Sequence, residues 1–252
     1  MPITEKTLSR LSSQRENPAH ECSSFALWSY EWEAGRKFRK NSPEAQGTLF
    51  KHFKDRISET NPSIIFFGLN RGEGKSEHTK NRSVIMEGNN RAPKFHNFHT
   101  VGHAGDTKLQ NLVAEVDGVA GAYMTDFDYL TSDNNAHRVI SKIRSDDKHR
   151  KSLWRDFRKQ LRILDEPRYK IICLKPELYR ILESHPPKDT TVISSSVGTV
   201  HYFRIELDGR ECVFFNCWHH SAAKKRDEKI EQLRSVLSLS NRLLKNPVFL
   251  YI

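Results

Sequence analysis

Short runs of apolar residues, bounded by polar and turn-forming residues, predict several buried strands. The clearest run is Ile64–Gly68, which follows a chain break at Asn61-Pro62. Asp208-Gly209 separates two further runs and predicts a hairpin, because glycine tolerates the positive φ of a tight turn. Strands are therefore expected at 64–68, 122–125, 170–174, 201–207 and 212–217.

Helical spacing of apolar residues alternates with these strands. The clearest case is Lys151–Leu164, where Leu153, Phe157 and Leu161 form an apolar stripe opposite a basic face of the kind that is ordinarily solvated. Further helices are expected over 106–116, 176–182 and 222–245, with a mixed helical pattern over 25–57. The alternation of strands and helices predicts an α/β sandwich with a largely parallel sheet.

Length and composition indicate a single large unit. The 252 residues contain no Gly/Ser linker, Pro-rich spacer or solenoid-type repeat. The longest apolar run is too short to span a bilayer, and the N-terminus lacks the apolar region of a secretory signal. The four cysteines have no CxxC spacing, so neither a disulfide framework nor an iron–sulfur cluster is predicted, and a cytoplasmic location is favoured.

The net charge adds a first functional indication. Forty-one Lys and Arg against 31 Asp and Glu give a charge of +10 and a pI near 9.5. Such a field attracts polyanions and speeds encounter with them. The charge alone is equally consistent with a basic protein that has no nucleic-acid role.

Polar side chains with catalytic chemistry follow three of the predicted strands. Asn70 comes directly after the first strand, Asp126 ends the second, and His219 with Ser221 follows the last. Ligands of open α/β sheets bind at the carboxyl ends of the strands. An amide, a carboxylate and an imidazole are therefore expected around one crevice, although each residue alone is more typical of a turn or a surface.

The stretch 71–105 has little periodicity, which in a compact domain predicts a binding loop. Phe95 and Phe98 in this stretch are candidates for stacking on a flipped base, with core packing as the alternative. Three histidines of the same stretch have no fourth ligand at a suitable spacing, so no metal site is predicted. They are His96, His99 and His103.

Four segments, in this order, resemble motifs of the uracil-DNA glycosylase superfamily. "IIFFGLNRG" is similar to the first motif, often Gly-x-Asn-Pro-Gly, and "GAYMTDFDYL" to the second-strand segment. "YKIICLKPELYRIL" resembles the third strand and its helix, and "FFNCWHHSA" the last strand running into a His-Pro-Ser motif. The resemblance covers roughly residues 60–240. It implies a three-layer α/β/α sandwich with a mostly parallel four-stranded sheet over 61–252, with 1–60 as an N-terminal helical segment packed on it.

The resemblance also implies site residues. Asn70 matches the residue that orients or activates the attacking water, and His219 matches the histidine that stabilises the departing base. The residues expected near the base are Gly68, Leu69, Asp126, Phe95 and Phe98. The residues expected at DNA phosphates are Arg71, His220, Ser221, Lys224, Lys225 and Arg226, assisted by the N-terminus of the following helix. Arg71 and His220 replace prolines of the motifs and Lys175 replaces a common glycine, which puts ordinary uracil specificity in doubt.

The sequence thus predicts a DNA glycosylase that flips a damaged or modified base and needs no cofactor. No lysine is placed clearly enough to suggest a Schiff base, so a monofunctional, hydrolytic reaction leaving an abasic site is favoured. A resemblance to bacterial anti-phage glycosylases suggests glucosylated hydroxymethylcytosine in viral DNA as a target. The alternatives are a non-catalytic nucleic-acid-binding module on the same fold and an α/β protein that binds nucleotides rather than DNA.

Overall fold

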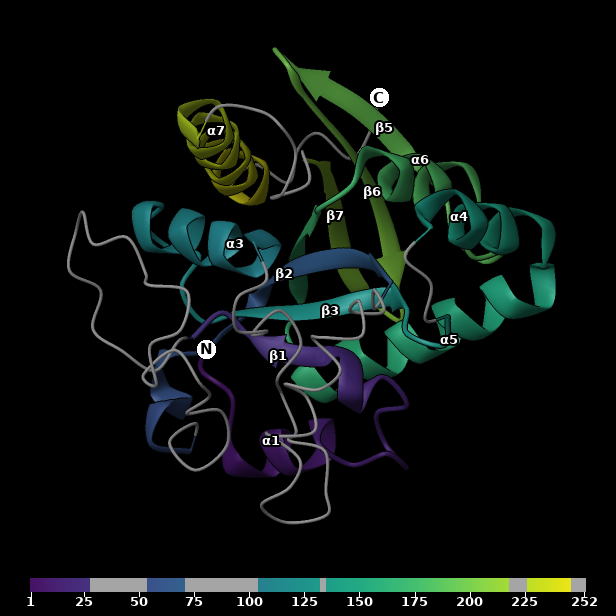
Figure 1. The fold of residues 1–252 in the computed structure, drawn as a ribbon, viewed down its shortest axis with the longest axis horizontal. Coiled ribbons are helices and arrows are strands. Elements are labelled where there is room, and N and C mark those ends of the chain that lie inside the picture. Colours follow the sequence, from purple (N-terminus) through teal and green to yellow (C-terminus); the bar gives the residue numbers. More distant parts are fainter. Residues whose placement is uncertain (28–53, 71–103, 132–134, 218–225, 246–252) are drawn as a thin grey trace.

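A mixed sheet of seven strands lies at the centre of the computed structural model, which describes residues 1–27, 54–70, 104–131, 135–217 and 226–245 (Figure 1). The strands are β1 Ser23–Phe25, β2 Asn61–Asn70, β3 Ala122–Asp128, β4 Arg168–Cys173, β5 Ile193–Val197, β6 Val200–Leu207 and β7 Arg210–Asn216. The helices are α1 Glu5–Leu11, α3 Ala104–Glu115, α4 Ala136–Ser145, α5 Asp147–Leu164, α6 Pro176–Ser184 and α7 Arg226–Lys245, with 3₁₀ helices η1 His20–Cys22 and η3 Lys54–Glu59.

The strand order across the sheet is β1-β3-β2-β4-β7-β6-β5. The four central strands, β3, β2, β4 and β7, run parallel to one another. Strand β1 is antiparallel to β3, and β6 is antiparallel to both β7 and β5, so β5 shares the direction of the central four. A largely parallel sheet is confirmed. The predicted number of four strands is wrong for the sheet as a whole, because three more strands extend its two edges.

The hairpin prediction is confirmed in detail. Asp208 and Gly209 connect β6 to β7 with φ values of 52° and 75°, both in the left-handed region that this turn requires. The helical pattern predicted for 25–57 is wrong at its start, since Phe25 is the last residue of β1 and pairs with Tyr123 of β3. Strand β1 thereby ties the N-terminal segment into the sheet.

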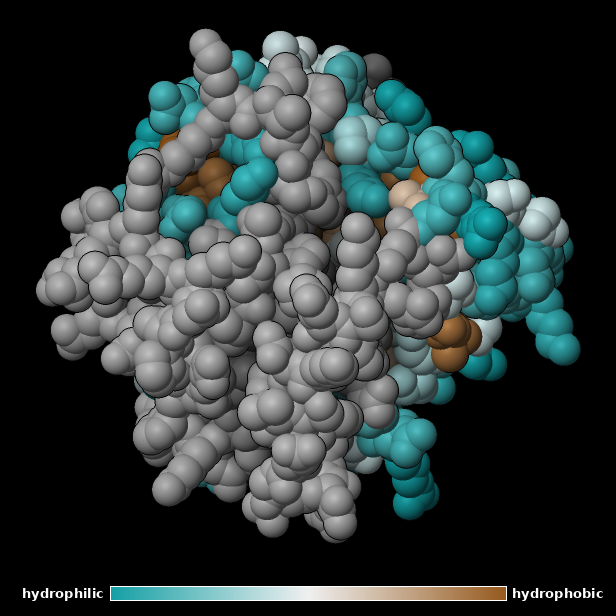
Figure 2. All heavy atoms as spheres, viewed as in Figure 1, coloured by the Kyte–Doolittle hydropathy of each residue, from teal (hydrophilic) through white to brown (hydrophobic). Residues whose placement is uncertain are grey.

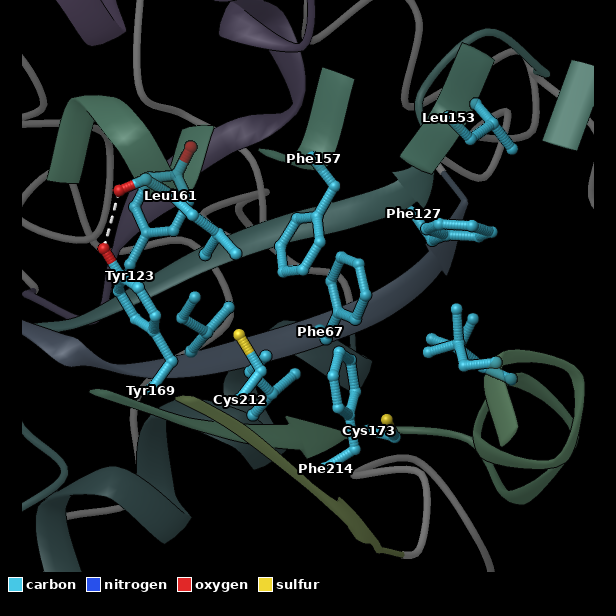
Figure 3. Close-up of a cluster of buried hydrophobic side chains, with 14 of the residues drawn as sticks. Phe67, Tyr123, Phe127, Leu153, Phe157, Leu161, Tyr169, Cys173, Cys212 and Phe214 are labelled. Atoms are coloured by element: carbon cyan, nitrogen blue, oxygen red, sulfur yellow. Dashed lines mark hydrogen bonds between the residues drawn. The ribbon is translucent and has the colours of Figure 1, made fainter. Parts of the chain in front are cut away.

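Helices cover both faces of the sheet (Figure 1). Successive side chains of a strand point to opposite faces, so Phe66 packs with the α3 and α7 side and Phe67 with the α5 side. On the α5 side, the Phe67 ring stacks on Phe157 with 4.5 Å between centroids, and Phe214 lies in the same cluster (Figure 3). Trp154 extends this aromatic cluster through an edge contact with Phe214. This core fixes β2 in the middle of the sheet and therefore fixes where its last residue, Asn70, lies.

The surface of the described residues visible in Figure 2 is mostly hydrophilic, with small hydrophobic areas between polar ones. Leu130 and Ile193 are among the large apolar residues that are more than two-fifths exposed. None of the helices in the described ranges is both long enough and apolar enough to cross a bilayer.

Candidate functional site

Three adjacent parallel strands reach the same carboxyl edge of the sheet, and β2 continues three residues beyond the ends of the other two. Phe67 of β2, Cys173 of β4 and Asn216 of β7 are successive pairing partners across the sheet. One residue further on, the Leu174 amide donates to the Phe67 carbonyl at 2.9 Å, and the Cys217 amide donates to the Cys173 carbonyl at 3.1 Å. The chain therefore leaves all three strands at the same edge, where ligands of α/β sheets bind.

Asn70 is the last residue of β2 at this edge and is partly buried. Its side-chain Nδ2 donates a hydrogen bond of 3.2 Å to the Thr131 carbonyl oxygen, in the segment that follows β3. This bond fixes the carboxamide, because holding the NH₂ group at one point also sets the direction of the amide oxygen. The placement of Asn70 at the strand end agrees with the sequence prediction.

A buried pair of side chains, Asp128 and His149, supports the segment that accepts the hydrogen bond from Asn70. Asp128, the last residue of β3 and the pairing partner of Asn70, is fully buried. One of its carboxylate oxygens, Oδ1, accepts from the Thr131 amide at 3.0 Å, and the other, Oδ2, lies 2.9 Å from Nε2 of His149. The side chain of His149, in the first turn of α5, is 9% exposed. Lys142 also donates to the Thr131 hydroxyl at 3.1 Å, so Asn70 is bonded to a residue that two other side chains, Asp128 and Lys142, also hold.

Sequence reasoning missed the Asp128–His149 pair. Asp128 lies only two residues beyond the predicted Asp126, within the segment "GAYMTDFDYL", so the sequence could have indicated it. His149 carries no such signal, because its contact with Asp128 depends on how α5 packs against the end of β3.

Asp126 and Lys175 lie at the same edge. Asp126 is 4% exposed and pairs with Gly68 of β2, whereas the side chain of Leu69 packs into the core. Lys175 follows β4 and immediately precedes α6, with an extended backbone at φ −141° and ψ 130°. Burial lowers the pKa of Lys175, although the Glu177 and Asp126 carboxylates act in the opposite direction. The Lys175 amine and the Asp126 carboxylate are therefore close enough to interact electrostatically.

Most of the other predicted site residues lie outside the described residues. These are Arg71, Phe95, Phe98, His219, His220, Ser221, Lys224 and Lys225. The predicted helix after β7 is described from Arg226, of which only the backbone is described. The described residue nearest in sequence to His219 is Cys217, at the same edge as Asn70.

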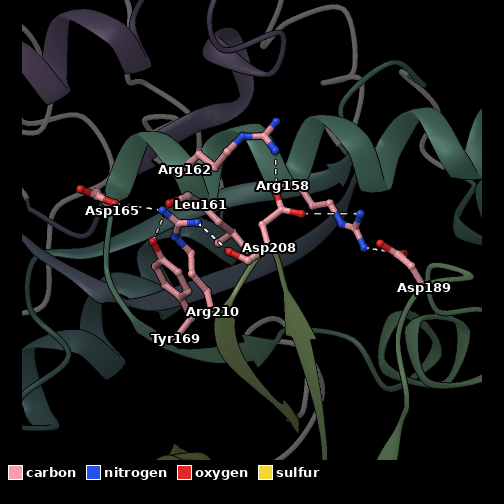
Figure 4. A network of polar contacts seen from close by, with 8 residues as sticks. All are labelled: Arg158, Leu161, Arg162, Asp165, Tyr169, Asp189, Asp208 and Arg210. Atoms are coloured by element: carbon pink, nitrogen blue, oxygen red, sulfur yellow. Dashed lines mark hydrogen bonds and ion pairs between the residues drawn. The ribbon is translucent and has the colours of Figure 1, made fainter.

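The basic face of α5 takes part in ion pairs rather than being merely solvated. Arg158 contacts Asp189 at 2.7 Å and Asp208 at 3.7 Å, and Arg162 contacts Asp208 at 2.6 Å (Figure 4). A groove of about 560 Å³ runs along this face, and its lining contains six Lys and Arg and three Asp. These pairs tie α5 to the β6–β7 turn and to the segment after α6, and they leave the groove with a net positive lining.

Within the described ranges, no three His, Cys, Asp or Glu side chains come together in a way that could hold a metal ion. The described cysteines are all buried, and none of them forms a disulfide bond. No protein-family model matches the chain, and no curated protein sequence matches it significantly.

The arrangement gathers three kinds of chemistry at one edge. Asn70 offers an oriented amide, Asp126 and Asp128 offer buried carboxylates, and Lys175 offers an amine. An oriented amide is suited to holding a water molecule or a polar ligand group in a fixed direction.

Proposed function

We propose that the protein is a DNA glycosylase of the uracil-DNA glycosylase type, acting on a damaged or modified base. The observation that carries the proposal is the shared edge: Asn70 ends β2 at the carboxyl edge of the sheet, and His219 comes three residues after β7 ends at the same edge. Strands β2 and β7 flank β4, so their axes lie about 10 Å apart at the usual strand spacing, and Asn70 lies about 10 Å further along β2 than Phe67, which is level with Asn216. The extruded nucleotide would occupy the space between Asn70 and His219.

In this mechanism the enzyme stabilises the charges that develop as the N-glycosidic bond breaks. Positive charge grows on the sugar and negative charge on the leaving base, so groups matched to those charges lower the barrier more than groups matched to the substrate. Asn70 orients the water that attacks the sugar carbon, with its NH₂ group held on Thr131. His219 hydrogen-bonds the departing base.

The target base must leave the helical stack to reach this edge. The net charge of +10 supports binding to the phosphates that accompany it. Arg71 and His220, which replace motif prolines, favour a base other than uracil, and a glucosylated hydroxymethylcytosine of phage DNA is the proposed candidate.

The test uses oligonucleotides that carry uracil, hypoxanthine, hydroxymethylcytosine or its glucosylated form. After incubation with the protein, alkali converts abasic sites into strand breaks. We expect breaks for one modified base, reduced about 100-fold or more by Asn70→Ala and by His219→Ala, as when a stabilising donor is removed. The matched controls Asn241→Ala and His201→Ala change the same residue types on exposed positions of α7 and β6.

The other outcomes identify the alternatives. Salt-sensitive retention of DNA without breaks, unaffected by Asn70→Ala, indicates a non-catalytic binding module. Absence of DNA retention at low salt rejects both forms of the proposal.

A further inference from the structure

Lys175 is a half-buried lysine at the edge that carries Asn70 and Asp126, and it has no polar partner among the described residues. Within the part of the chain that the structure describes, its amine makes neither a hydrogen bond nor an ion pair. Other described lysines near the sheet are satisfied: Lys170 donates to Asn241 at 2.7 Å, and Lys159 contacts Asp156 at 3.0 Å. Placing an ammonium in a partly desolvated position without a partner opposes folding, so such a lysine invites a functional explanation.

The position of Lys175 in the fold is central to the site. Strand β4 lies between β2, which ends on Asn70, and β7, which leads to His219. Lys175 is the second residue after β4, with the backbone still extended. Lys175 is the residue before α6, and its side chain makes no capping hydrogen bond to that helix.

The environment of Lys175 makes its amine easier to deprotonate than the amine of a fully solvated lysine. Burial is the main cause that lowers its pKa, and the carboxylates of Glu177 and Asp126 only partly oppose it. A lysine that is easier to deprotonate adds more readily to a carbonyl carbon and forms a Schiff base.

We propose that Lys175 is a nucleophile toward an aldehyde, and that the aldehyde is C1′ of an abasic deoxyribose in DNA. This inference rests on the proposed function only in assuming that abasic DNA reaches this edge. It departs from the sequence prediction of a monofunctional enzyme, which depended on finding no well-placed lysine, because it adds strand cleavage to base removal.

The reaction balances without an oxidant or a further reactant. The Lys175 Nζ attacks C1′, the resulting carbinolamine loses water, and an iminium ion forms. A base removes the proton from C2′, a double bond forms between C2′ and C3′, and the C3′–O bond breaks so that the 3′ phosphate departs with the electron pair. Water then hydrolyses the iminium, which releases the unsaturated aldehyde and returns the lysine. The proposed acceptor of the C2′ proton is the carboxylate of Asp126, which is buried at this edge and interacts electrostatically with the Lys175 amine.

The competing explanation is that Lys175 only neutralises a DNA phosphate. An arginine would serve that purpose equally well, because it keeps the charge and adds donors. An arginine does not form a Schiff base with an aldehyde, so Lys175→Arg separates the two roles.

The experiment uses a duplex with one uracil converted beforehand to an abasic site by a separate, removed enzyme. The full-length protein is incubated with this duplex and sodium borohydride, which reduces an iminium to a stable amine. We expect a covalent protein–DNA complex whose adduct maps to Lys175 by mass spectrometry. In Lys175→Arg, trapping should fall by at least about tenfold, since no other amine replaces the nucleophile.

Lys170→Arg is the matched control. Lys170 lies on β4, five residues and about 16 Å before Lys175 along an extended chain. It is also half-buried and has its pKa lowered by burial, but its amine donates a hydrogen bond to Asn241. Trapping should be unchanged in this variant. Circular dichroism of each variant verifies that it is folded.

The outcomes are distinct from those of the proposed function. Trapping at Lys175 supports the inference even if no modified base is released. Base release without trapping, trapping that persists in Lys175→Arg, or an adduct on other lysines overturns it and leaves the glycosylase proposal intact.

Discussion

Removal of the Asp128 carboxylate should destabilise the protein and disturb Asn70 together. Asp128 is fully buried and holds two groups, the Thr131 amide at 3.0 Å and His149 Nε2 at 2.9 Å. Asp128→Ala leaves both groups without their acceptor in a part-buried region. Each orphaned group costs about 1–3 kcal/mol, and breaking a buried pair costs about 3–5 kcal/mol in all.

Thermal unfolding followed by circular dichroism at pH 7 measures this loss. For a chain of this size, 1 kcal/mol corresponds to about 2–4 °C, so the midpoint should fall by about 6–20 °C. Asp117→Ala is the control, because Asp117 is exposed and its removal should change stability by no more than about 0.5 kcal/mol.

A double-mutant cycle tests whether the partners are coupled. His149→Ala leaves a buried carboxylate unpaired, and the variant with both substitutions removes the mismatch that each single change creates. The double variant should therefore be more stable than the sum of the single losses predicts, by about 1–3 kcal/mol. If the two losses add within about 0.5 kcal/mol, Asp128 and His149 do not act as a pair and the support of Asn70 needs another explanation.

Three further substitutions test the framework of the site. Phe67→Ala should cost about 3–5 kcal/mol in urea unfolding, because it empties the centre of the aromatic cluster; a loss below about 1 kcal/mol would contradict the packing (Figure 3). Gly121→Ala should cost more than about 2 kcal/mol, since the added Cβ would lie 2.0 Å from the Glu59 carbonyl oxygen at a φ of +72°, and a neutral effect would refute that close approach. Burial raises the pKa of Asp156, but hydrogen bonds, including one from Tyr129, outweigh it and hold the pKa below its ordinary value, so its stabilisation is present at neutral pH and is lost on acidification. The stability gap between the wild type and Asp156→Asn should be about 1.5–3 kcal/mol at pH 7 and should narrow as the pH falls below about 3.9, the ordinary pKa of Asp; a gap that is constant with pH would show that charge is not its cause.

The parts of the fold that the sequence predicts well are those with a strong apolar period. Strands β2, β3 and β4 and helices α3, α5 and α6 appear where apolar spacing indicates them. Strand β5 was missed because its sequence, Ile-Ser-Ser-Ser-Val, is exposed along its whole length and has no apolar face. Strand β1 has three residues, all buried, which is too short for any alternation to register.

Helix α4 was within reach of the sequence. Its cap, Asn135, accepts from the amides of His137 and Arg138, which is a standard helix-start signal. Its buried residues Val139, Ile140 and Ile143 also lie at helical spacing.

The residues of the site also divide into those that the sequence predicts and those that it does not. Asn70 and Asp126 could be placed from the sequence, because each follows an apolar run and parallel strands end at a common edge. The pairing of Asp128 with His149 joins residues 21 positions apart through the packing of α5 on β3, and no local pattern encodes it.

Lys170 and Lys175 illustrate what sequence alone leaves out. Both are lysines at the ends of one apolar run, and burial lowers the pKa of each. The two lysines differ in what the surrounding elements bring to them. Helix α7 brings Asn241 to Lys170, whereas Lys175 interacts with Asp126 electrostatically and has no hydrogen bond among the described residues. At the first position a satisfied amine stabilises the contact between helix and sheet. At the second position, the amine follows β4, which lies between the strand that ends on Asn70 and the strand that leads to His219. A glycine at this position, as in the motif that the sequence resembles, would supply no nucleophile.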